Sequence, residues 1–139
     1  MNLKNLTQQL TKQELIPLQT ALSHAITVHL RWFGEVNKAF ICNTNAPQGF
    51  CDNDQPYQHC KFGKWYSGVT NIKITENEEF KLIGLYHQDV HMIVCSLIDE
   101  LKEKRSISEV NYRALLESQN HLFEKLIYFT LSISEAINH

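Results

Sequence analysis

The chain has 139 residues, with thirteen basic and fifteen acidic side chains and a net charge of −2. This length suits one domain with its own core, and 43% hydrophobic with 20% charged residues excludes a wholly disordered chain. The balanced charge argues against a domain that mainly grips nucleic-acid phosphates. Because no apolar run reaches the roughly 18–20 residues that span a bilayer, and because the start is too polar for a signal peptide, we expect a cytoplasmic protein without membrane insertion.

Apolar residues recur mostly at steps of three and four, which predicts an all-α fold. Pro17 suits a first helical turn, so the first long helix is expected over about 17–40. Residues 1–16 are weakly periodic and predict a separate N-terminal segment, as a short helix or a frayed end. Residues 42–59 are rich in Asn, Asp and Pro, which predicts a loop of a length typical of functional segments.

The second half of the chain continues the helical pattern. One or two helical turns are expected within residues 58–68, followed by long helices over about 76–104 and 107–137. Two capping boxes are predicted to begin these long helices: Thr75 with Glu78, and Ser106 with Glu109. Residues 17–139 are therefore expected to form a four-helix-type bundle with an additional short helix.

Four residues have the types and spacing of a metal site. His87 and His91 are four apart in a predicted helix, so both imidazoles face its apolar side. His29 falls on the inward face of the first long helix, and Cys60 stands near the start of the short element, where a helix N-terminus favours the thiolate. Three imidazoles and a thiolate suit tetrahedral zinc. From spacing alone, three buried histidines and an inert cysteine remain the alternative.

Three pieces of the sequence together resemble the chemoreceptor zinc-binding (CZB) domain family: His29-Leu30-Arg31-Trp32, Cys60-Lys61-Phe62-Gly63-Lys64-Trp65 and His87-Gln88-Asp89-Val90-His91. The family pattern is a His followed by aromatic residues, then Cys-x-apolar-Gly-x-apolar, then His-x-x-x-His. The resemblance covers about residues 20–139. It implies a helical bundle that binds one Zn²⁺ through His29, Cys60, His87 and His91, with Trp32, Phe62, Gly63 and Trp65 as the supporting core.

The resemblance also implies a regulatory role rather than an enzyme. Such domains are typically fused to bacterial chemoreceptors or diguanylate cyclases, where they report zinc or thiol-oxidising conditions to a chemotaxis or cyclic-di-GMP output, and they tend to be homodimers. A structural bundle that zinc only stabilises is the alternative. A di-iron enzyme is disfavoured, because it needs a Glu three residues before a core His, and Gly84 stands there before His87.

The remaining cysteines suggest redox chemistry. Cys42, Cys51 and Cys60 are spaced evenly by nine, so Cys42 or Cys51 is a candidate to pair with Cys60, or with each other, under oxidation. Cys95 follows His91 by four on the same helix face. We expect Cys95 to be a small buried hydrophobe rather than a spare metal ligand.

Overall fold

The computed structural model describes residues 3–44, 51 and 55–139. Its helices are α1 (Leu3–Gln9), α2 (Lys12–Cys42), α3 (Pro56–His59), α4 (Lys61–Gly68), α5 (Ile72–Thr75), α6 (Glu78–Lys104) and α7 (Glu109–Asn138). The described part of the chain contains no β-strand, and the predicted all-α fold is confirmed. None of these helices combines the length and the apolarity needed to cross a bilayer.

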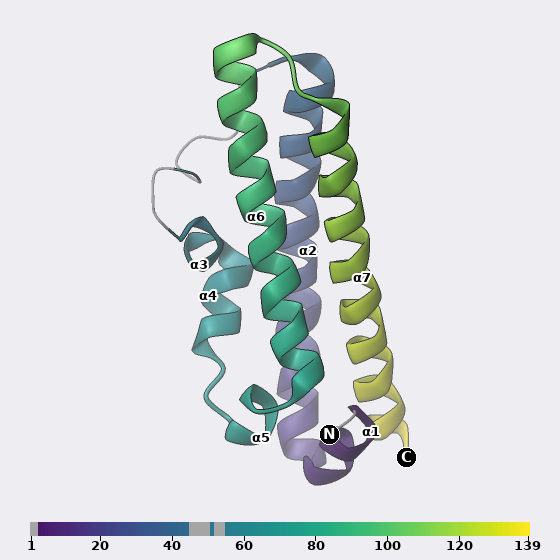
Figure 1. Cartoon of the computed structure of the whole chain (residues 1–139). Helices are drawn as coiled ribbons and strands as arrows, with labels where there is room; N and C mark the ends of the chain where they lie inside the picture. Colours follow the sequence, from purple (N-terminus) through teal and green to yellow (C-terminus); the bar gives the residue numbers. More distant parts are fainter. Residues whose placement is uncertain (1–2, 45–50, 52–54) are drawn as a thin grey trace.

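The three long helices α2, α6 and α7 run side by side, and the short helices lie beside them (Figure 1). Helix α7 packs against both α6 and α2, while α4 packs against α2 and α3 packs against α6. The α3–α4 pair therefore fills the fourth position of the bundle. This arrangement confirms the predicted four-helix-type bundle with an additional short element.

The first long helix begins earlier than predicted. Thr11 caps α2, because its side-chain oxygen accepts the Glu14 N–H at 3.2 Å while the Glu14 carboxylate accepts the Thr11 N–H at 3.1 Å. Pro17 lies inside the helix rather than in its first turn. The predicted start at residue 17 is therefore wrong, and α2 crosses the boundary drawn between residues 1–16 and 17–139.

The other two long helices are capped by residues that the spacing did not select. Asn77 is the N-cap of α6, and its side chain accepts the Phe80 N–H at 3.2 Å. Thr75 cannot take this role because it already belongs to α5. Ser108, rather than Ser106, begins α7 through its side-chain oxygen. The predicted capping boxes are wrong, since Asn and Ser immediately before a helix reach its free N–H groups directly.

The core lies where the faces of α2, α6 and α7 meet. Leucines such as Leu97, Leu115 and Leu122 are fully buried there, and each contributes roughly 1.5–3 kcal/mol by its burial. Within the described residues, five polar side chains are also buried: His29, Asn77, His87, His91 and Gln119. Buried polar groups need partners to offset lost hydration, so these residues indicate a candidate functional site within the core.

Candidate metal centre

Three histidines from two long helices meet in the core. His29 lies on α2, and His87 and His91 lie one turn apart on α6. One ring nitrogen of each lies within 4.8 Å of those of the other two. The side chains are only 2%, 3% and 0% exposed, respectively. The structure therefore brings together the three histidines that the sequence pattern selected.

Cys60 reaches this cluster from the junction between α3 and α4. Its backbone is extended, and it is the N-cap of α4 rather than a residue within a helix. The Cys60 Sγ lies 3.2 Å from His87 Nε2 and accepts the Gly63 N–H at 3.1 Å. Tetrahedral zinc places ligand atoms about 3.3–3.8 Å apart, so the sulfur–nitrogen contact is close to that spacing. The three histidines and Cys60 are positioned to hold a metal ion.

Gly63 permits the junction that carries Cys60. A Cβ at this position would lie 1.8 Å from the Tyr57 carbonyl oxygen, which no side chain can tolerate. The absence of a side chain thus allows the backbones of α3 and α4 to approach closely. Phe62 is 1% exposed, and its ring lies 4.5 Å from the His87 ring, so it anchors the junction against α6.

The two tryptophans support the site at different distances. Trp32 stacks on the His91 ring, with centroids 4.2 Å apart and planes 16° apart. Trp65 is partly buried and meets Phe62 edge-on at 5.5 Å. Trp32 therefore orients a histidine directly, whereas Trp65 acts through Phe62.

The buried imidazoles are neutral, and two of them have unpartnered ring nitrogens. Burial lowers the pKa of His29 to about 4 and that of His91 to about 3. Burial, then the neighbouring His91 and His29, lowers the pKa of His87 to about 2. Among the described residues, neither ring nitrogen of His91, nor Nδ1 of His29, has a hydrogen-bond partner. Because unpaired buried nitrogens are costly, a bound metal ion would satisfy them, and the donor set fits zinc.

Cys60 differs from the sequence expectation in its protonation. Burial raises the pKa of the Cys60 thiol, and the Gly63 amide N–H at the start of α4 only partly offsets this. The expected preference for the thiolate is therefore outweighed by burial. Since metals bind the thiolate, binding would have to displace the thiol proton.

Gln119 on α7 is a member of this cluster that the sequence analysis missed. Its side chain is 3% exposed, and its Oε1 lies 3.2 Å from His29 Nε2. A signal was present, because Gln119 stands four residues after Leu115 and three before Leu122, which are both core positions. A polar residue on such a face is a candidate partner for a buried polar group.

A cavity of about 380 Å³ lies beside the histidine cluster, and His29, Trp32 and Cys60 line it. Arg31 and Lys64 also border this cavity. The cavity therefore adjoins the Cys60 side of the site.

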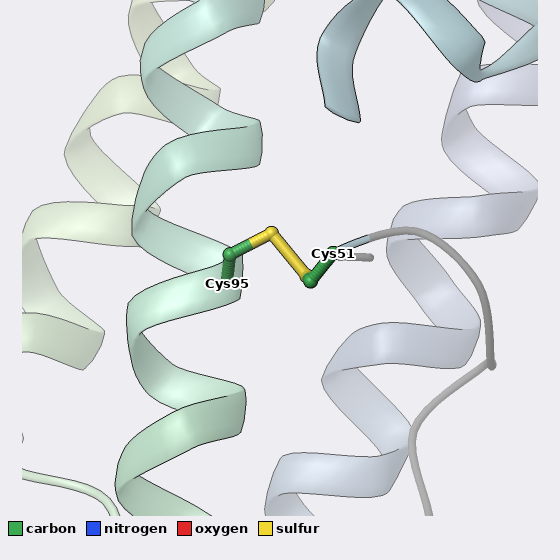
Figure 2. Close-up of a disulfide and its surroundings, with 2 residues drawn as sticks. All are labelled: Cys51 and Cys95. Carbon is green, nitrogen blue, oxygen red and sulfur yellow. A yellow bond between two sulfur atoms is a disulfide. The ribbon is translucent and has the colours of Figure 1, made fainter. Parts of the chain in front are cut away.

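The cysteine pairing differs from the one that spacing suggested. Cys51 and Cys95 form a disulfide with their Cα atoms 5.5 Å apart (Figure 2). Cys42 is an exposed free thiol, and Cys60 is a buried one. The structure thus forms none of the predicted bonds among Cys42, Cys51 and Cys60. The expectation for Cys95 is also wrong, because it is a partly buried disulfide partner, and no spacing rule reveals that position 51 lies beside α6.

The comparisons with known proteins agree with this geometry. A solved structure described as the regulatory CZB domain of DgcZ superposes with a TM-score of 0.71 and 18% identity, covering 86% of this chain and 98% of that one, which shows a shared fold. No curated protein sequence matches the chain. The family model for the chemoreceptor zinc-binding domain matches residues 29–97, from the first clustered histidine to just beyond the last. Residues 29–97 of the chain belong to the chemoreceptor zinc-binding domain family.

Proposed function

We propose that the chain is a regulatory sensor domain that binds one Zn²⁺ through His29, Cys60, His87 and His91. In this proposal it works in the cytoplasm and signals zinc level or thiol oxidation to a bacterial chemotaxis or cyclic-di-GMP output. The observation that carries the proposal is the set of buried, neutral imidazoles with unpartnered nitrogens beside the Cys60 sulfur.

The donor set favours binding over catalysis. Three imidazoles and one thiolate suit zinc among the common divalent ions. Four protein ligands fill a tetrahedral shell and leave no position for a water molecule that zinc could activate. The site would therefore tie α2, α6 and the α3–α4 junction together rather than act as an enzyme.

The arrangement of the ligands supports sensing. The histidines belong to long helices of the bundle, whereas Cys60 belongs to a junction between two short ones. Loss of the Cys60 ligand, by zinc release or by oxidation of its sulfur, would free the junction while the long helices stay packed. Hydrogen exchange with and without zinc should thus change most over residues 56–68, and unchanged exchange there would refute this account.

Zinc content is the first test. We expect one zinc per chain in the purified protein by elemental analysis, and loss or loosening of zinc in Cys60→Ala and in His91→Ala. His24→Ala is the matched control, because His24 lies exposed on the same helix as His29 and should leave zinc content unchanged. A wild-type protein that stays free of zinc after loading would overturn the proposal.

A bundle that zinc only stabilises is the second candidate, and the burial of all four ligands favours it. The two candidates differ in the metal-free state. A sensor must stay folded without zinc, whereas a zinc-dependent scaffold unfolds. Far-ultraviolet circular dichroism after chelation separates them, because retained helicity supports the sensor and lost helicity supports the scaffold.

The proposal includes a homodimer and a fused or separate output module as partners. Leu116, Ile127 and Leu131 on α7 are 40%, 56% and 62% exposed. Their separations of eleven and four residues place them on one helix face, which a second copy could cover. Sedimentation should show a dimer, and a strict monomer at high concentration would remove this part of the proposal.

A further inference from the structure

We propose that Cys51 and Cys95 are a second redox site, which exchanges reversibly with low-molecular-weight thiols and disulfides and thereby adjusts the metal affinity of the bundle. This inference rests on the proposed function for the metal part alone. The disulfide joins two segments that each lead to candidate ligands, and Cys60 itself takes no part in it.

The position of the bridge connects it to the metal centre. Cys95 lies on α6 four residues after His91, which is one helical turn. Cys51 precedes Cys60 by nine residues along the chain. The bridge therefore fastens the segment that leads to Cys60 onto the same helix that carries two of the histidines (Figure 2).

The exposure of the residues favours exchange at this pair rather than at Cys60. Cys51 and Cys95 are both partly exposed, whereas Cys60 is 6% exposed. Exchange requires a thiolate to reach the disulfide sulfur, so exposure governs its rate. Disulfides in the cytoplasm are mostly transient and redox-sensing, which suits a reversible pair.

The chemical step balances with a small disulfide as oxidant. The Cys51 and Cys95 thiols together give up two electrons and two protons and form one S–S bond. The small disulfide breaks its S–S bond, takes up those electrons and protons, and leaves as two thiols. The reverse reaction with a small thiol passes through a mixed disulfide and restores both cysteines.

The bridge should strengthen metal binding by adding an anchor ahead of the junction that carries Cys60. Helix α3 packs against α6 and Pro56 is buried, so the α3–α4 junction already has one anchor there. The bridge adds a second anchor at Cys51, five residues before Pro56. The added anchor restrains the junction near the histidines, and such preorganisation should raise zinc affinity by roughly threefold. By linkage, zinc must favour the disulfide over the dithiol by the same factor.

The test uses the whole protein, equilibrated in glutathione disulfide or in reduced glutathione. Alkylation and mass spectrometry count the free thiols, and a chromophoric chelator reports zinc affinity. We expect the bond between Cys51 and Cys95 to form in the first buffer and to open in the second, with about threefold tighter zinc binding when it is formed. Cys51→Ser/Cys95→Ser should bind zinc like the reduced wild type in both buffers, and Cys42→Ser should behave like the wild type.

Three results would overturn the inference: free thiols at both positions in glutathione disulfide, a bond from either cysteine to Cys42 or Cys60, or equal zinc affinity in the two redox states. Failure of the proposed function would give a different result, namely no zinc binding in either redox state. The thiol count needs no metal, so it would still report whether the bridge forms and opens.

Discussion

The candidate metal centre has two halves that are held in different ways. The histidine half belongs to α2 and α6, which are 31 and 27 residues long and pack along α7. The cysteine half is a junction between helices of four and eight residues, held by the close approach at Gly63 and by Phe62. Many packing contacts hold each long helix in place, so the loss of one contact moves it little. The short junction is held by only a few contacts. The difference makes the cysteine half the part that can detach.

The largest expected effect concerns the histidine half without metal. An unfolded histidine takes up a proton near pH 6.5, whereas these three folded imidazoles stay neutral down to about pH 4 or lower. Because the unfolded state binds more protons, stability falls as pH drops below 6.5, by roughly 2 kcal/mol for each histidine at pH 5. Urea unfolding of the metal-free protein at pH 7 and pH 5 measures this loss.

His29→Leu provides the control for this pH effect. It removes one buried imidazole and should reduce the loss of stability between pH 7 and 5 by about a third. Most carboxyl groups titrate below this window, so they contribute little to the difference. Equal losses in the variant and the wild type would show that the neutral state of His29 is not what links stability to pH.

The next effect concerns the cysteine half. Gly63→Ala forces a Cβ against the Tyr57 carbonyl oxygen, so the junction must open and move Cys60. We expect at least a tenfold loss of zinc affinity and a destabilisation of about 2–3 kcal/mol. Gly34→Ala is the matched control, because nothing lies within 4 Å of its Cβ position on α2 and the change should stabilise the helix by up to about 1 kcal/mol. Chelator competition measures the zinc affinity, and urea unfolding measures the stability.

Proton release on zinc binding should distinguish the contribution of the cysteine half from that of the histidine half. The imidazoles are already neutral at pH 7, whereas the raised pKa of Cys60 keeps its thiol protonated. Each zinc bound therefore releases one proton, and affinity rises about tenfold per pH unit between pH 6 and 8. In Cys60→Ala the remaining affinity should vary little over this range. A wild-type affinity that is flat with pH would contradict the assignment of the released proton to Cys60.

The smallest expected effect tests the link between α7 and the histidine half. The Gln119 Oε1 can only accept, so its contact with His29 Nε2 holds the ring proton there and leaves the lone pair on Nδ1. Gln119→Leu should weaken zinc binding about tenfold. It should also lower the free energy of unfolding by about 1–3 kcal/mol, because the buried His29 ring N–H loses its acceptor.

Nitrogen-15 NMR of the imidazoles gives a reading of Gln119→Leu that does not depend on metal. We expect the proton of His29 to distribute over both ring nitrogens in the variant. Gln119→Glu keeps an acceptor at the same place and should restore the wild-type tautomer. If the tautomer is the same in wild type and Gln119→Leu, the side chain fills space and does not position His29.

The sequence predicted the features that depend on helical spacing. The long helices and the meeting of His87, His91 and His29 follow from a period near 3.6 residues, because that period decides which side chains face the core. The Cys-x-apolar-Gly pattern selected Cys60, although the residue caps a helix rather than lying in one.

The features that spacing missed depend on contacts between distant segments. The bond of Cys95 to position 51 and the contact of Gln119 with His29 join residues 44 and 90 positions apart. The predicted helix starts were wrong for a local reason. Several neighbouring polar residues could cap each helix, and spacing alone did not select the actual caps, which are Thr11, Asn77 and Ser108.

The histidines stand near the midpoints of their helices, and this has a mechanical consequence. Helix α2 extends about 46 Å and α6 about 40 Å, each with half its length on either side of the cluster. A metal ion bound at the centre of two helices fixes their separation there but resists their rotation about that point poorly. Binding or release of the ion would therefore tilt one helix relative to the other, and the displacement would be largest at the helix ends.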